Sequence, residues 1–144
     1  MKTIKLPGAV MLAVLLCSAC ATSPAHSPTL YEQMGGQGGI ETITDNFLAN
    51  LAADTRIAHF FADTDIPKFR SMLIKQFCSV AAGPCTYDGK SMYEAHEKKN
   101  IKDADFNALV EDLQKAMDDA HVAQGVQARF LAQLVPMHQD IVNH

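Results

Sequence analysis

Residues 83–96 read GPCTYDGKSMYEAH. The Gly83-Pro84 pair ends one helical pattern, because proline cannot continue a helix and glycine favours its end. Gly89 marks a turn, and the stretch then runs into His96. A single histidine is usually a surface or core residue, so its role depends on the sequence around it.

On both sides of this stretch, apolar residues recur at the three- and four-residue spacing of amphipathic helices. Three such faces are visible: Ile40, Ile43, Phe47 and Leu51; Phe106, Leu109, Val110, Leu113, Ala116 and Met117; and Val126, Phe130, Leu134, Met137 and Ile141. No stretch alternates with period two for long enough to predict a strand. The sequence therefore predicts an all-α fold.

Helix starts and stops agree with this fold class. Residues 63–65 (DTD) followed by Pro67 predict a helix start, since proline is tolerated in the first turn and acidic residues favour the N-terminus. Asp103 is predicted to cap the next long helix. Pro136 is expected to kink or end the last one.

The glycine-rich segment GGQGG at residues 35–39 has two readings. It follows no predicted strand and lacks the Gly-Lys-Ser/Thr ending of a phosphate-binding loop. We therefore expect a turn before a helix that begins near Ile40.

The first 20 residues resemble a bacterial export signal of the lipoprotein type. Two lysines precede an apolar run at residues 9–16, which is too short to span a bilayer. The next residues resemble a lipobox with Cys20 as the lipidation candidate, although Cys17 stands where leucine is usual. Ordinary signal cleavage after Ala21 fits as well. Either route predicts export, with the domain in the periplasm or tethered to the outer membrane.

Residues 21–29 are small and polar with two prolines, which predicts a flexible tether before a domain at residues 30–144. The 144-residue chain carries 12 Lys+Arg against 16 Asp+Glu. Without the two signal lysines, 10 basic residues remain against 16 acidic ones, a net charge of about −6. Such a domain is not expected to bind nucleic acid, and membrane contact is expected only through an N-terminal lipid.

Cys78 and Cys85 remain after export and lie seven residues apart across the Gly83-Pro84 turn. In an oxidising compartment they can close a short disulfide loop. The alternative is two separate thiols, one of them buried in a helix. Their spacing is not that of a zinc site.

From Leu30 to Val142 the chain resembles a group 1 truncated haemoglobin, the shortened two-over-two globin. The resemblance is carried, in order along the chain, by LYEQMGG at 30–36, HFF at 59–61, the stretch at 83–96 and residues 101–106. It implies haem b held without covalent attachment in a two-over-two globin fold. No Cys-x-x-Cys-His sequence is present, so c-type attachment is not expected.

By this resemblance, His96 is the ligand that binds haem iron. Phe61 matches the phenylalanine that wedges against the porphyrin. Five further residues match positions that line the haem pocket: Tyr87, Met92, Ile101, Phe106 and Leu109. Plain core packing explains each of these apolar residues too. Lys98 and Lys99 are candidates to pair with the haem propionates, or are a solvated charge pair.

On the distal side, the sequence departs from the family. Leu48 and Leu73 stand where many members carry the tyrosine and glutamine that hydrogen-bond oxygen, and Phe69 shares the helix face of Leu73. One such bond is worth ~1.5–3 kcal/mol, so its loss is expected to speed oxygen dissociation roughly ten- to a hundredfold. Carbon monoxide is less polar when bound and should be affected less. Tight oxygen storage and nitric-oxide dioxygenation are therefore disfavoured.

Met72 stands where some members place a second iron-binding histidine. Ligation by His96 and Met72 is the combination that raises the reduction potential in cytochromes c. The alternative is that Met72 is a flexible gap-filler beside the haem.

The leading functional prediction is an exported haem b globin that reversibly binds oxygen or another diatomic gas in an apolar pocket and is not primarily an enzyme. A one-electron carrier with His96/Met72 ligation, whose redox partner the sequence does not identify, is the main alternative. Chemistry on nitric oxide or peroxide is disfavoured because the predicted pocket holds no acid–base group. A haem-free interaction module would leave His96 idle.

Overall fold

The computed structural model describes residues 26–143, which form helices and connecting segments without a strand. The all-α prediction is therefore confirmed. The elements are α1 (Leu30–Gln33), α2 (Gly36–Ala53), η1 (Ala58–Phe61), α3 (Ile66–Val80), α4 (Met92–His96), α5 (Asp103–Asp119), α6 (Gln124–Leu134), η2 (Val135–Met137) and α7 (His138–Ile141), where η denotes a 3-10 helix. The predicted signal, Cys20 and most of the tether lie outside the described residues. No described helix is long and apolar enough to cross a membrane.

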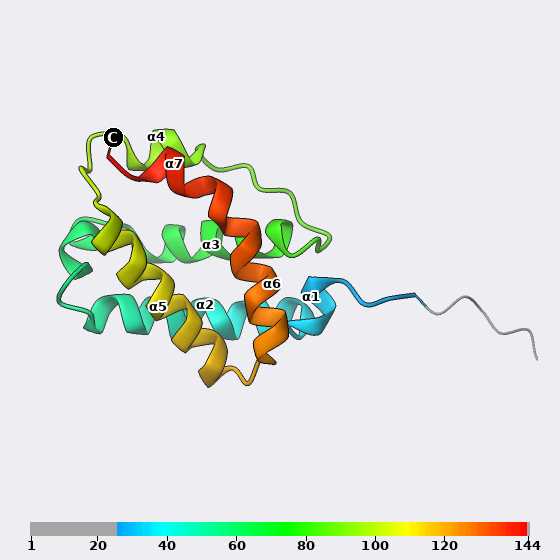
Figure 1. Ribbon diagram of the computed structural model, residues 1–144. Helices are drawn as coiled ribbons and strands as arrows, with labels where there is room; N and C mark the ends of the chain where they lie inside the picture. The colour runs from blue at the N-terminus through cyan, green and yellow to red at the C-terminus, as the bar shows by residue number, and fades with distance from the viewer. Residues whose placement is uncertain (1–25, 144) are drawn as a thin grey trace, which may run out of the picture.

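Two layers of helices cross each other (Figure 1). Helices α2 and α3 run side by side in one layer, and α5 and α6 pass over them in the other. The most extensive helix contacts are those of α2 with α5 and with α3. The short helices α4 and α7 pack together at the end of the molecule beyond α3. This is the two-over-two arrangement that the sequence predicts.

The core lies where the four long helices meet. The predicted face of α2, formed by Ile40, Ile43, Phe47 and Leu51, is fully buried. The Phe77 ring of α3 lies 5.9 Å from that of Phe47 and meets Phe130 of α6 edge-on at 5.6 Å. Burial of large aromatic side chains in such contacts supplies much of the stabilisation of a core.

The predicted faces of α5 and α6 are each divided into two parts. Ala116, Met117, Val126 and Phe130 lie in the closed core, and Leu113 is buried at its boundary, where it also lines a cavity. Six other predicted positions are only partly buried and line a cavity instead: Phe106, Leu109, Val110, Leu134, Met137 and Ile141. The apolar periodicity therefore predicted the inward faces correctly without separating the core from the cavity wall.

Helix α2 begins at Gly36, so the prediction of a start near Ile40 was wrong by four residues. Gly35 caps the helix with φ 93°, a left-handed conformation that favours glycine. At Gly39 a Cβ would lie only 1.8 Å from the carbonyl oxygen of Met34. Glycine lets the preceding chain pass this close to the first turn of the helix, so the glycine run extends into the helix.

The other predicted boundaries are close to those observed. Asp65 caps α3 by accepting a hydrogen bond from the Lys68 backbone N–H at 3.1 Å. The cap of α5 is Lys102 and not the predicted Asp103, because the Asp105 carboxylate accepts the Lys102 backbone N–H at 2.9 Å. Pro136 ends α6 as expected, since it lies in the 3-10 turn η2.

Cys78 and Cys85 form a disulfide with their Cα atoms 5.8 Å apart. Cys78 is completely buried near the end of α3, and Cys85 is partly buried in the following loop. The bridge therefore joins α3 to the loop that carries Tyr87 toward α4.

We predict that this disulfide stabilises the fold without being needed to hold a cofactor. Closing so short a loop contributes about 2–3 kcal/mol on the chain-entropy account, so Cys85→Ser should lower the melting temperature by on the order of 10 °C. Thr86→Ala, at the exposed neighbouring position, should change it little. Thermal unfolding followed by circular dichroism measures both. Loss of haem from Cys85→Ser at room temperature would show instead that the bridge holds the pocket.

Candidate functional site

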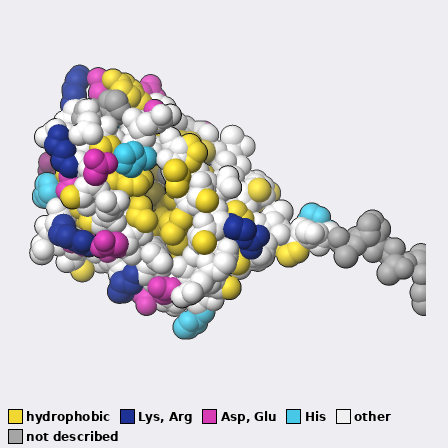
Figure 2. Space-filling model, viewed as in Figure 1, with side chains coloured by type: hydrophobic (Ala, Val, Ile, Leu, Met, Phe, Trp, Pro, Cys, Tyr) yellow, Lys and Arg dark blue, Asp and Glu magenta, His cyan; other side chains and the backbone are white. Residues whose placement is uncertain are grey.

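A cavity of about 700 Å³ opens on one face of the molecule, where apolar side chains gather in a hollow (Figure 2). Its walls come from α3 on one side and α4 on the other, with α5, α7 and the turn around η1 completing it. This volume lies within the range of roughly 300–1,000 Å³ that is usual for cofactor and small-molecule sites. The helices place residues far apart in the sequence around one space.

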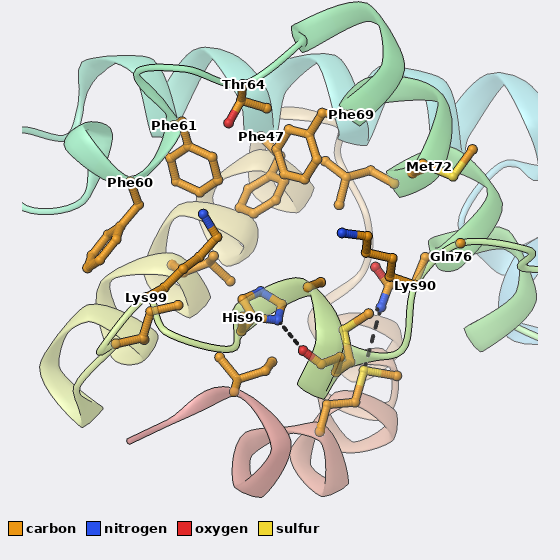
Figure 3. A pocket seen from close by; sticks show the side chains of 18 of the residues that line it. Phe47, Phe60, Phe61, Thr64, Phe69, Met72, Gln76, Lys90, His96 and Lys99 are labelled. Atoms are coloured by element: carbon orange, nitrogen blue, oxygen red, sulfur yellow. Dashed lines mark hydrogen bonds between the residues drawn. The ribbon is translucent and has the colours of Figure 1, made fainter. Parts of the chain in front are cut away.

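The α3 wall is mostly apolar. Its cavity-lining side chains recur at helical spacing: Phe69, Met72, Leu73, Gln76 and Phe77. The Phe69 ring stacks on the ring of Phe61, which lies in η1 before α3. The two ring centroids are 5.5 Å apart. Both rings project over the cavity in Figure 3. They form a flat apolar surface opposite α4.

His96 lies on the α4 wall and faces α3 across the cavity (Figure 3). Its Nδ1 lies 2.6 Å from the Met92 carbonyl oxygen, one helical turn earlier. A carbonyl only accepts hydrogen bonds, so Nδ1 carries the proton and donates. The lone pair is therefore on Nε2, the ring nitrogen that points into the cavity.

Burial keeps this histidine in its neutral form. Desolvation is the main cause that lowers the pKa of His96, and the positive charge of Lys99 lowers it further, whereas the Met92 hydrogen bond acts in the opposite direction. A neutral imidazole with a fixed tautomer is the form that binds a metal ion. The tautomer of His96 and the lowered pKa of its ring both suit a residue that would bind a metal ion.

The rim of the cavity is positively charged at three lysines: Lys68, Lys90 and Lys99. The amino groups of Lys90 and Lys99 extend over the cavity in Figure 3. Within residues 26–143, none of the three forms an ion pair with a carboxylate. A ligand with carboxylates at the rim would therefore meet unpaired cations.

The acidic residues of the rim already have partners. Asp65 caps α3, Asp105 accepts the Lys102 backbone N–H, and Asp88 pairs with Lys75 at 2.8 Å. None of these three carboxylates forms an ion pair with Lys68, Lys90 or Lys99. The site suits an apolar ligand body with a negatively charged edge.

Most of the sequence-predicted site residues meet at this cavity. Nine of them line it, together with Met72: Phe61, Phe69, Leu73, Tyr87, Met92, His96, Ile101, Phe106 and Leu109. Leu48 is not among the lining residues; it packs against the core, and its neighbour Phe47 lines the cavity instead. Lys98 also lies elsewhere, since it is highly exposed and pairs with Glu97 at 3.7 Å.

Sequence reasoning missed several lining residues, above all Gln76, Lys68 and Lys90. Gln76 could have been found, because it lies three residues after Leu73 on the same helix face. The two lysines left no such signal, since only the folded chain brings α3 and the loop before α4 to one rim. Gln76 also corrects the expectation of a wall without hydrogen-bond donors.

Haem b fits these features. A porphyrin is flat and apolar with two carboxylates on one edge, which suits the aromatic α3 wall and the lysines of the rim. His96 offers one nitrogen to the iron. In residues 26–143 no cluster of three or more His, Cys, Asp or Glu residues offers an alternative metal site. The site therefore suits a protein that binds haem, with His96 as the residue that would hold the iron.

Comparison with known proteins specifies the family. Residues 29–143 match the family described as bacterial-like globin. The chain is 35% identical over 122 residues to the group 1 truncated haemoglobin GlbN of Synechocystis sp., which covers 80% of this chain and 98% of that protein. It is 31% identical over 98 residues to a group 1 truncated haemoglobin of Tetrahymena pyriformis, covering 68% and 81%.

Solved structures agree with the sequence match. The crystal structure of truncated haemoglobin from Tetrahymena pyriformis in its Fe(III) form superimposes with a TM-score of 0.79 at 26% identity, covering 81% of this chain and all of that one. The chain belongs to the group 1 truncated globins. Truncated globins bind haem, and haem b is the usual globin cofactor, so the predictions of fold and cofactor are confirmed.

We predict that Lys99, and not its neighbour Lys98, helps to retain haem. Removing one partly solvated charge pair costs about 0.5–1 kcal/mol, so Lys99→Met should speed haem loss about two- to fivefold. Lys98→Met, one residue away but outside the cavity, is the matched control and should lose haem at the wild-type rate. Haem transfer to excess apomyoglobin measures both rates. Equal acceleration by the two substitutions would point to a general charge effect.

Proposed function

We propose that this globin reversibly binds a small diatomic gas in a pocket that holds oxygen loosely. The observation that carries the proposal is the pairing of one correctly oriented histidine with an apolar wall on the opposite side of the cavity. Globins in general bind diatomic gases. Beyond this general property, we propose that the ligand is oxygen or another diatomic gas and that oxygen is released quickly.

Haem iron, when bound, supplies a coordination position that can take up a gas molecule. The residues of this chain decide what surrounds that position. His96 holds the proximal side, while Phe69 and Leu73 present only carbon atoms on the α3 wall. Apolar side chains exclude water and admit uncharged gases. Since Phe69 and Leu73 carry no acid–base group, this part of the wall favours reversible binding over bond cleavage.

Two of the donors that line the cavity, Gln76 and Tyr87, are hydrogen-bonded within the chain. The Gln76 amide donates to Met92 Sδ at 3.2 Å and to Met137 Sδ at 3.7 Å. Both bonds turn the amide nitrogen toward α4 and η2. Oxygen gains partial negative charge on haem and depends on a hydrogen bond more than carbon monoxide does. Because Phe69 and Leu73 offer no donor to bound oxygen, we expect oxygen to dissociate quickly.

Leu73→Gln tests this proposal by adding a donor on the α3 wall. We expect oxygen dissociation to slow by roughly ten- to a hundredfold, because one hydrogen bond to a partly charged ligand is worth ~1.5–3 kcal/mol. Carbon monoxide dissociation should change by less than about threefold. Leu73→Met, similar in length but without a donor, is the control. Stopped-flow displacement measures all rates.

Two outcomes would contradict the proposal. One is ferrous protein that takes up neither oxygen nor carbon monoxide at equilibrium. The other is wild-type oxygen release already as slow as that of Leu73→Gln, which would show that the wild-type pocket contains an effective donor.

A second candidate function is one-electron transfer with His96 and Met72 as axial ligands. Met72 lines the same cavity as His96. In Figure 3, however, its side chain lies along α3 with the sulfur turned away from His96, so ligation requires a change of rotamer. We therefore rank this candidate below gas binding.

Visible spectra of Met72→Leu separate the two candidates. A low-spin ferrous spectrum that becomes five-coordinate in Met72→Leu supports electron transfer. A five-coordinate ferrous spectrum that is the same in both proteins supports gas binding. The two outcomes are exclusive because the thioether either occupies the sixth position or leaves it open.

We also propose that the protein is exported and tethered by a lipid on Cys20. The lipobox-like residues 16–20 support this, and the Cys78–Cys85 disulfide suits an oxidising compartment. Cell fractionation should place the wild-type globin with membranes and Cys20→Ala in a soluble exported fraction. Recovery of the wild-type chain in the cytoplasm with free thiols would contradict export.

A further inference from the structure

Two methionine sulfur atoms from different elements meet at one amide side chain. The Gln76 amide nitrogen on α3 lies 3.2 Å from Sδ of Met92 on α4 and 3.7 Å from Sδ of Met137 on η2. One of these contacts is drawn in Figure 3. A thioether sulfur is only a weak hydrogen-bond acceptor. Both sulfur atoms therefore keep electron pairs that a stronger partner can use.

The chemistry of these three side chains suits a soft, singly charged metal ion. Thioether sulfur is a soft ligand, of the kind that selects Cu(I). The two thioethers and the amide are all neutral, so a singly charged ion costs less to bury among them than a divalent ion. Divalent ions favour His, Cys, Asp and Glu, and no group of three or more of these side chains in residues 26–143 could hold a metal ion.

The distances around Gln76 suit three ligands of one ion. A metal–sulfur bond is about 2.3 Å long, so two ligand atoms of one ion at tetrahedral or trigonal angles lie roughly 3.7–4 Å apart. Half a turn of the Gln76 amide would place Oε1 where Nε2 now lies, at 3.2 and 3.7 Å from the two sulfur atoms. The unbranched methionine and glutamine side chains can make the remaining small adjustments by bond rotation.

An ion can be held here while haem occupies its own cavity. The side chains of Gln76, Met92 and Met137 are only partly buried. They also line a second cavity of about 260 Å³ between the end of α3, the loop before α4, and η2. Ser79 and Val80 line this second cavity and not the haem cavity. The second cavity therefore leaves room for an ion beside the two sulfur atoms.

We propose that Met92, Met137 and Gln76 form a binding site for one Cu(I) ion, with two thioether sulfur atoms and the amide oxygen as its ligands. The ion would join α3, α4 and η2. Because His96 is not among the ligands, the site is separate from the one that would hold haem iron, and it does not depend on gas binding. The Cys78–Cys85 disulfide leaves no free thiol in residues 26–143 to compete for the ion.

Silver(I), which resembles Cu(I) but is stable in air, tests the site. The haem-loaded full chain is used with Cys17→Ser and Cys20→Ser, so that no N-terminal thiol takes up silver. Equilibrium dialysis without chloride should show one tight site. Met137→Leu removes a ligand and should weaken this site at least about tenfold. Met72→Leu is the matched control, since Met72 lines the haem cavity but not the second cavity, and should bind silver like the parent protein.

Gln76→Met tests the third ligand by adding a donor. A third thioether of similar length replaces the amide oxygen, so the affinity for silver(I) should rise by about tenfold or more. Gln76→Leu offers no donor and should lower it. Equal affinities in Gln76→Met and Gln76→Leu would overturn the site, and this comparison holds even where Met137→Leu does not fold.

X-ray absorption spectroscopy of the same protein loaded with Cu(I) identifies the ligand atoms. We expect two sulfur neighbours at about 2.3 Å and one lighter neighbour, with one sulfur neighbour lost in Met137→Leu. A shell of nitrogen or oxygen atoms alone would overturn the site. So would silver binding that Met137→Leu and Gln76→Leu both leave unchanged, because the ion would then be held elsewhere on the chain.

Discussion

The hydrogen bond from His96 Nδ1 to the Met92 carbonyl is the interaction on which the haem site depends. It fixes the tautomer and aims Nε2 across the cavity at the α3 wall. Helix α4 has only five residues, so it needs local support to hold this geometry. Ser91 and Glu94 provide it through a reciprocal capping box, in which each side chain accepts a backbone N–H of the other residue.

Helix α3 lies opposite His96 and forms the facing wall of the cavity. Phe69, Leu73 and Phe77 of α3 line the cavity, and Phe77 also packs against Phe47 and Phe130 in the core. The rim then adds Lys68, Lys90 and Lys99, none of which forms an ion pair with a carboxylate in the described part of the chain. The aromatic wall and the cationic rim match the apolar body and the charged edge of haem. Phe69 and Leu73, on the wall opposite His96, offer no hydrogen-bond donor.

Sequence reasoning predicted the helices, their inward faces and a pocket that includes His96, because apolar periodicity and the motif that ends at His96 are local signals. It could not distinguish the cavity-lining Phe106 and Leu109 from the core residue Met117, since core and cavity wall need the same residue types. Nor could it place Leu48 away from the cavity, because one residue along a helix changes the facing direction by about 100°. The Gln76 contacts with two thioethers depend on three separate elements and had no sequence signal.

Resonance Raman spectroscopy of the ferrous, ligand-free protein tests the central claim most directly, because it detects the bond between iron and the proximal histidine. The account predicts an iron–histidine stretching band in the wild-type protein. The band should vanish in His96→Gly and return when imidazole is added, since imidazole can replace the lost side chain at the iron. An iron–histidine band that persists in His96→Gly without imidazole would contradict the account, because another histidine would then bind the iron.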